Sequence, residues 1–159
     1  DALPSRERFL SADTVFIGSP RDAVAALQPD CNSVALLMSH NFPRDVEAFR
    51  ALVPVRPRFI GLLGPRHRAQ RLIEEAEALG AHIDTALRSS IYGPVGLDIG
   101  AETPAEVALA ISAEVQALLQ GRHGGHARLR TAPLHAAAST NANTLAGQPG
   151  PRLCALEPV

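Results

Sequence analysis

Short apolar runs alternate along the chain with longer stretches in which apolar residues recur every three or four positions. VALLM at 34–38 and RFIGLL at 58–63 lack the polar alternation of a half-exposed strand, which predicts two strands buried on both faces. TVFIG at 14–18 predicts a further short strand. Strands covered on both faces are typical of parallel sheets, because the crossover helices lie on either side.

Helices are expected in the stretches between and after these strands. Each expected helix has a proline at its start, and the three after the first have an apolar stripe at helical spacing. The expected ranges are 20–28, 43–53, 65–79 and 104–120. This alternation predicts an α/β fold, a Rossmann-like parallel sheet with flanking helices.

One element of that fold is missing from the sequence. A Rossmann sheet opens with a strand followed by G-x-G-x-x-G, and no such string occurs, so we expect that the first strand–helix unit is lacking. In the usual strand order 3-2-1-4-5-6, the missing strands would lie between 14–18 and 34–38 and leave a gap unless another chain fills it. We expect residues 1–121 to form the C-terminal part of the domain. Residues 122–159 have little periodicity and many small residues, which predicts a disordered low-complexity tail.

Composition narrows the possible functions. The net charge is −1, so nothing indicates a nucleic-acid or anionic-membrane partner. Cys31 and Cys154 lie far apart and lack metal-ligand spacing, so we expect a reducing cytoplasm and no disulfide framework. No apolar run reaches the ~20 residues that span a bilayer. The sequence has no Ser-His-Asp set, phosphate-binding P-loop or zinc motif, which argues against a self-contained hydrolase or kinase.

The stretch GPVGLDIGAETPAE at 93–106 is the richest in candidate binding residues. Its glycine and acidic positions before the helix are Gly93, Gly96, Asp98, Gly100 and Glu102. Thr103 and Glu106 predict a capping box at the helix start. Such glycines permit positive φ and the close approach of a ligand, and the helix start supplies free N–H groups. The residues equally permit a structural connection in which Asp98 bonds its own turn.

Two strand ends carry further candidates. Gly61 and Gly64 bracket the end of one strand, and Arg66 to Arg68 follow at a helix start, where helix N–H groups and guanidinium can bind an anion. The alternative is a solvated first turn in which Arg71 pairs with Glu75. His40 and Asn41 follow the other strand at its carboxyl end, where α/β sheets bind ligands.

Each candidate histidine could also have no role in function. His40 could donate a hydrogen bond to a ligand or move a proton near neutral pH, or it could be a satisfied structural residue. His123, His126 and His135 could chelate a metal, but their glycine- and alanine-rich setting favours incidental surface histidines. We therefore assign no metal site.

Three strings together resemble the XdhC/CoxI family, accessory proteins for molybdenum hydroxylases such as xanthine dehydrogenase. They are MSHN at 38–41, FIGLLGPRHR at 59–68 and the stretch at 93–106, which occur in that family's order and at plausible spacing. The resemblance covers residues 1–135. It implies a molybdenum cofactor-binding chaperone that supports sulfuration of molybdopterin and its insertion into a xanthine dehydrogenase-type hydroxylase, with no turnover of its own.

The same resemblance implies the site and the partners. It places cofactor binding at His40, Asn41, Gly61, Gly64, Arg66, Arg68, Gly96, Asp98, Gly100 and Glu102. The cofactor phosphate would be held by Arg66 or Arg68, and we expect their replacement to leave the fold nearly undisturbed. The partners would be a cysteine desulfurase and the molybdenum-binding subunit of the hydroxylase, in the cytoplasm, with a homodimer also open.

Two other functions remain from the residues alone. An NAD(P)-dependent oxidoreductase or nucleotide-sensing Rossmann domain fits the fold class. The absence of G-x-G-x-x-G argues against it for this chain, although a longer parent could hold a dinucleotide. The other possibility is a truncated product that binds nothing.

Overall fold

The computed structural model describes residue 9 and residues 11–131, and these contain a three-stranded parallel sheet. The strands are β1 (Val34–Leu37), β2 (Phe59–Leu62) and β3 (Ile91–Tyr92), in the order β1-β2-β3. Val34 lies opposite Phe59, and Ile60 lies opposite Ile91. The predicted α/β class with a parallel sheet is confirmed.

Four helices of the described chain begin within one residue of the expected starts. They are α1 (Pro20–Leu27), α2 (Phe42–Leu52), α3 (Arg66–Ala78), α4 (Thr85–Arg88) and α5 (Pro104–Leu119), followed by the 3₁₀ helix η2 (Ala127–Leu129). Ser19 Oγ accepts the Asp22 N–H at the start of α1. At α5, Thr103 and Glu106 form the predicted capping box, in which side chains satisfy backbone N–H groups that the helix leaves open. The sequence did not predict β3 or α4.

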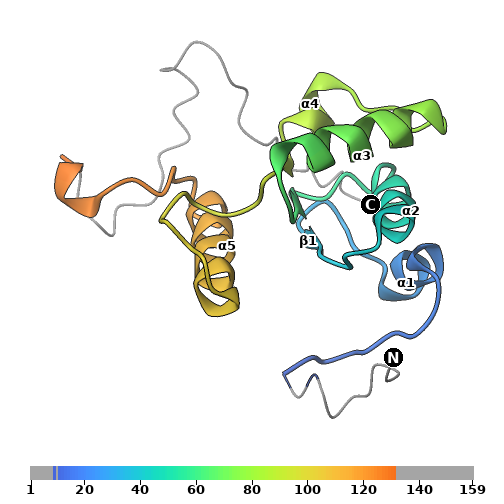
Figure 1. The fold of residues 1–159 in the computed structure, drawn as a ribbon, viewed down its shortest axis with the longest axis horizontal. Helices are drawn as coiled ribbons and strands as arrows, with labels where there is room; N and C mark the ends of the chain where they lie inside the picture. The colour runs from blue at the N-terminus through green and yellow to red at the C-terminus, as the bar shows by residue number, and fades with distance from the viewer. Residues whose placement is uncertain (1–8, 10, 132–159) are drawn as a thin grey trace, which may run out of the picture.

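The helices cover the two faces of the sheet separately. Ile60 and Leu62 pack into a core with α2 and α3, whereas Phe59 packs on the other face with Val95 and with Ile111 of α5. This division follows from the alternation of side chains along a strand. In Figure 1, α5 lies on one side of β1, and α2 and α3 lie on the other. The arrangement leaves the carboxyl edge of the sheet bounded by helix starts.

The segment 14–18 is not a strand, which corrects the sequence-based expectation. Phe16 and Ile17 are 38% and 60% exposed. A strand needs a neighbour whose N–H and C=O groups pair with its own, and β1 pairs only with β2 in the described part of the chain. Apolar β-branched character alone could not supply that neighbour.

Three further expectations concern cysteine, the membrane and the tail. Cys31 is disulfide-bonded in the structure, contrary to the expectation of reduced cysteines, and Cys154 lies outside the described residues. Within residues 11–131, no helix is both long and apolar enough to cross a bilayer. Most of the expected tail, residues 132–159, lies outside the described residues, so its predicted disorder stays a prediction.

Candidate functional site

The carboxyl ends of all three strands lie at one edge of the sheet, because the strands are parallel. β1 continues into residues 38–41, β2 into 63–66 and β3 into 93–96. The edge therefore brings together segments from all three strings that the sequence singled out. The helices α2 and α3 also begin here.

The loop after β1 exposes a histidine and uses its asparagine locally. His40 is exposed and has φ of +55°, a left-handed conformation uncommon for a residue other than glycine. Asn41 is the N-cap of α2, since its Oδ1 accepts the Arg44 N–H at 3.1 Å, and its own N–H donates to Ser39 Oγ at 3.2 Å. Thus His40 is accessible at this edge, whereas the amide oxygen of Asn41 already has a partner.

A buried carboxylate that the sequence analysis missed holds this loop to α3. Arg68 Nη2 donates to Asp45 Oδ2 at 2.7 Å, and the hydroxyl of Ser39 donates to Asp45 Oδ1. Arg68 Nη1 also donates to the Leu63 carbonyl at 3.3 Å. The Asp45 side chain is 3% exposed and that of Arg68 is 22% exposed. Arg68 is therefore a structural ion-pair residue, which contradicts the expectation that its replacement would leave the fold nearly undisturbed.

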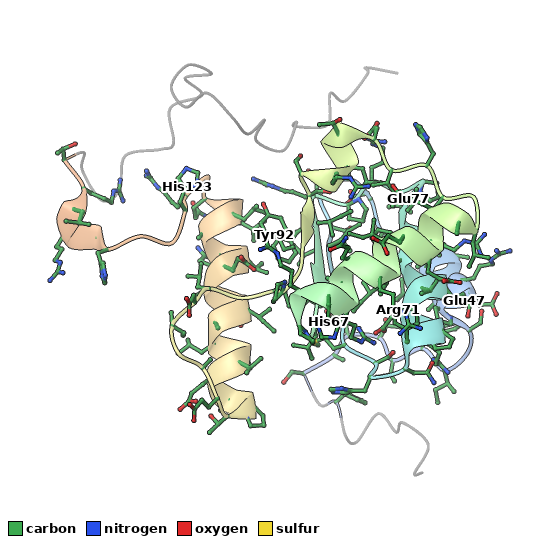
Figure 2. The ribbon with its side chains drawn as sticks, turned by 45° about the horizontal axis from the view of Figure 1, so that its top comes forward. Glu47, His67, Arg71, Glu77, Tyr92 and His123 are labelled. Carbon is green, nitrogen blue, oxygen red and sulfur yellow. The ribbon has the colours of Figure 1, made fainter. Side chains whose placement is uncertain are left out.

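The neighbouring arginines point to different surroundings. The Arg71 guanidinium lies 4.7 Å from the centroid of the Phe42 ring, a cation–π distance, and forms no ion pair with Glu75 in the described residues. Figure 2 shows His67 and Arg71 on the same side of α3. Arg66 is exposed, has no ion pair within residues 11–131, and lines a groove on the β3 side of α3.

That groove reaches the carboxyl edge of the sheet at Gly93, which directly follows β3. It has a volume of about 450 Å³ and lies between α3 and β3. Gln70 and Glu74 follow Arg66 along one wall, and Gly93 marks the end that opens at the strand ends. The sequence analysis singled out Arg66 and Gly93 in this groove but neither Gln70 nor Glu74.

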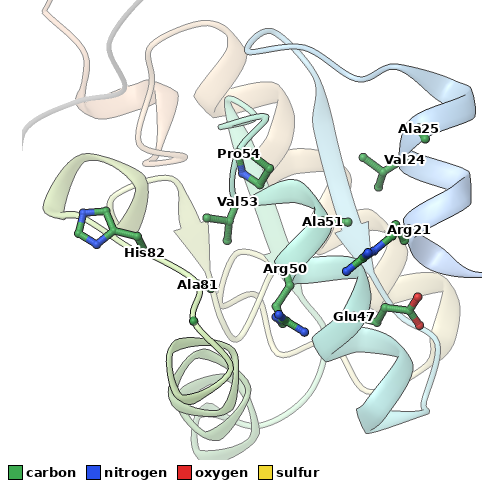
Figure 3. Close-up of a pocket in the computed structure, with 11 residues that line it drawn as sticks. Arg21, Val24, Ala25, Glu47, Arg50, Ala51, Val53, Pro54, Ala81 and His82 are labelled. Atoms are coloured by element: carbon green, nitrogen blue, oxygen red, sulfur yellow. The ribbon is translucent and has the colours of Figure 1, made fainter.

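A second groove of about 450 Å³ lies away from the predicted residues, between α1, α2 and the loop after α3 (Figure 3). Arg21, Arg50 and His82 contribute its basic groups. Arg50 Nη2 donates to the Leu79 carbonyl at 2.8 Å, so this side chain ties α2 to the end of α3. None of the sequence-predicted site residues lines this groove.

The glycine-rich loop adopts the backbone that its glycines permit. Gly96 and Gly100 have φ of +115° and +72°, and the Gly96 N–H donates to Glu114 Oε2 of α5 at 2.7 Å. Asp98 and Glu102 are exposed, and neither side chain has a hydrogen bond or ion pair with the described residues. The alternative in which Asp98 bonds its own turn is therefore not seen, and Asp98 remains available to a ligand.

Two side chains near this loop and α5, Tyr92 and Glu106, have shifted pKa values. Burial raises the pKa of Tyr92, and the charge of Glu114 adds to that effect. Tyr92 stacks on Phe59 with ring centroids 4.3 Å apart, on the side of the sheet that faces α5 (Figure 2). Backbone N–H groups of Thr103 and Glu102 lower the pKa of Glu106. Both shifts have local causes.

The two glycines at β2 differ in accessibility. Gly61 is buried, and a Cβ there would lie 2.6 to 2.8 Å from side-chain atoms of Leu36, Val95 and Phe59, so the absence of a side chain serves packing. Gly64 has φ of +116° and makes the turn into α3.

No group of three His, Cys, Asp or Glu residues in the described chain could hold a metal ion, and His135 lies outside it.

Comparison with known proteins identifies relatives for most of the chain. A family model described as the XdhC Rossmann domain matches residues 1–115. A protein of Bacillus subtilis named as a probable subunit of xanthine dehydrogenase is 32% identical over 107 residues, which cover 67% of this chain and 30% of that protein. An uncharacterized protein YqeB of Escherichia coli is 31% identical over 103 residues, covering 65% of this chain and 18% of that protein.

A solved structure agrees with the fold. The crystal structure of a xanthine dehydrogenase from Bacillus halodurans matches with a TM-score of 0.63 and 28% identity, covering 75% of this chain and 33% of that one. The chain thus spans about a third or less of the length of these relatives.

Proposed function

This chain belongs to the XdhC Rossmann domain family, and we propose that it acts as an accessory domain for a xanthine dehydrogenase-type molybdenum hydroxylase. In this proposal the chain binds the finished molybdenum cofactor as cargo, supports its sulfuration and passes it to the hydroxylase. It is a carrier without turnover of its own. The xanthine dehydrogenase names of two relatives support the association with this class of enzyme.

One observation supports cargo binding above the others. Arg66 stands exposed at the carboxyl edge with no ion pair among the described residues, beside a groove of about 450 Å³. The cargo carries a phosphate, and a guanidinium at a helix start is suited to a phosphate. Arg68 does not fit this role, because its guanidinium is engaged by Asp45.

The pterin part of the cargo is planar and rich in N–H donors. Asp98 is an exposed carboxylate without a partner in the described chain, and a carboxylate can accept such N–H groups. Gly96 and Gly100, two positions away on either side, take positive φ, which lets the loop turn sharply before and after Asp98. The residues at this edge therefore fit the cargo, with Arg66 toward the phosphate.

The proposed carrier role implies partner proteins and a cellular location. We propose that the chain meets the molybdenum-binding subunit of the hydroxylase and a cysteine desulfurase in the cytoplasm. The dinucleotide alternative has less support, because none of the loops after β1, β2 and β3 contains G-x-G-x-x-G.

Cofactor retention tests this function. The chain is co-expressed with the cofactor pathway, purified, oxidised and assayed for pterin fluorescence. Arg66→Ala should reduce retention by about tenfold or more, since one charge-assisted hydrogen bond is worth about 1.5–3 kcal/mol. Asp98→Asn should reduce retention with an unchanged melting temperature, and Glu75→Gln, an exposed change on another side of α3, should alter neither. The proposal fails if the wild-type chain retains no molybdopterin while an authentic carrier in the same cells does.

A further inference from the structure

The groove between α3 and β3 has different chemistry at each end. Arg66, Gln70 and Glu74 recur at intervals of four residues, so they form one stripe along α3. All three line the groove. Arg66 lies at the carboxyl edge, and Glu74 lies eight positions further, about 12 Å along the helix axis.

Apolar residues of α3 and β3 contribute the inner part of the groove. Ala69 is buried, and Ile73 and Ile91 are half-buried. At Gly93 the end of β3 lies so close to α3 that a Cβ would be 2.6 Å from Ala69 Cβ. An inner part of this kind suits the face of a planar ring better than a bulky aliphatic group.

The wall presents an arranged set of hydrogen-bonding atoms. Gln70 Nε2 donates to Glu74 Oε1 at 2.9 Å, which orients both side chains. Glu74 Oε2 and Gln70 Oε1 remain as acceptors, and Gln70 keeps one amide hydrogen. Adjacent acceptors of this kind match the N–H-rich edge of an aminopyrimidinone, the ring shared by guanine and pterins.

The far end of the groove is closed by an ion pair. Arg88 Nη2 donates to Glu77 Oε1 at 2.7 Å, which joins α4 to α3. Both charges are thereby engaged, so Arg66, at the other end, is the groove cation left without an ion pair within residues 11–131. An anion is favoured only at the carboxyl edge.

We propose that this groove binds a planar aminopyrimidinone that bears a phosphate, with the ring edge against Gln70 and Glu74 and the phosphate at Arg66. The inference rests on the proposed function, since the pterin cargo is such a compound. It assigns the aminopyrimidinone edge of the heterocycle to two residues of α3, so Asp98, which does not line this groove, would accept N–H groups elsewhere on the cargo.

The test uses two nucleotides that differ only in the base. Guanosine and adenosine 5′-monophosphate share ribose and phosphate, but only guanine offers adjacent ring and amino N–H donors to a carboxylate. Each is titrated into the ¹⁵N-labelled chain, together with neopterin monophosphate. The amide signals of Gln70, Glu74, Ile91 and Gly93 should shift, and the guanine compound should bind at least about tenfold more tightly than the adenine one.

Substitutions then assign the preference to its residues. Glu74→Gln should abolish the guanine preference while adenine-nucleotide binding persists, and Arg66→Ala should weaken both nucleotides. The matched control is Glu75→Gln, which removes the same charge from a neighbouring exposed position. Equal effects of the two glutamate changes, loss of the preference in Asp98→Asn, or signal shifts confined to other surfaces would overturn the proposal.

Two combined outcomes separate this inference from the function it rests on. If neopterin monophosphate occupies the groove but the chain retains no molybdopterin in cells, the groove assignment stands and the carrier function falls. If the chain retains molybdopterin and Glu74→Gln retains as much, the carrier function stands and the groove assignment falls. Unfolding midpoints in urea establish that each variant is folded.

Discussion

Replacing Arg68 by alanine should destabilise this protein far more than replacing the neighbouring Arg66. The change removes the guanidinium that donates to Asp45 Oδ2 at 2.7 Å and leaves a carboxylate that is 3% exposed without its counter-charge. It also removes a donor from the Leu63 carbonyl. Arg66→Ala breaks no ion pair within the described residues and is the matched control.

The expected cost is about 2–4 kcal/mol in the free energy of unfolding. Removing one partner of a fully buried ion pair costs about 3–5 kcal/mol. Here the value is lower, because the Arg68 side chain is 22% exposed and Asp45 keeps its contacts with the hydroxyl and the N–H of Ser39. Arg66→Ala should stay within about 0.5 kcal/mol, as is usual for surface substitutions.

Urea unfolding followed by circular dichroism measures both variants. With a slope of about 1–3 kcal/mol per molar urea, Arg68→Ala should lower the midpoint by about 0.7 M or more. Combining Arg68→Ala with Asp45→Ala should cost less than the sum of the single changes, because the double variant leaves no buried charge. The reasoning is refuted if Arg68→Ala costs no more than Arg66→Ala, or if the two changes at 45 and 68 are simply additive.

Two further outcomes follow from packing and from charge. Gly61→Ala should destabilise the protein by about 1–3 kcal/mol, since the new Cβ would lie 2.6 Å from Leu36 Cδ2. The control is Gly125→Ala, whose Cβ has no atom within 4 Å. Equal urea midpoints for the two variants would contradict the packing argument. A hydrogen bond from Arg56 and another from the Leu87 N–H lower the pKa of Asp84 from 3.8 to about 2. Because the pKa of Asp84 is lower in the folded state than in the unfolded state, its ionised carboxylate stabilises the protein above about pH 4, and this stabilisation is lost as the pH falls toward 2. Arg56→Ala should raise the pKa of Asp84 toward 3.8 in a carboxyl NMR titration. It should also make the free energy of unfolding less dependent on pH between about 4 and 2.

The sequence by itself determined the features that depend on neighbouring residues. The capping box of Thr103 and Glu106 is local, because a side chain bonds a backbone group three positions away, and it appears as predicted. Gly96 and Gly100 take positive φ for the same reason, since the absence of Cβ is a property of the residue itself. The two uninterrupted apolar runs became β1 and β2 because full burial on both faces leaves no polar alternation.

Only the tertiary structure decided which side chains are engaged and which are free. Arg66 and Arg68 are equivalent in the sequence, yet one is paired with a carboxylate 23 positions away and the other opens onto a groove. Residues 14–18 have strand character but no neighbour to pair with in the described chain. The groove forms because Glu74 of α3 and Gly93 after β3, which are distant in the sequence, line the same cavity. Each outcome depends on contacts between distant segments, which form only when the helices pack on the sheet, and no local pattern records them.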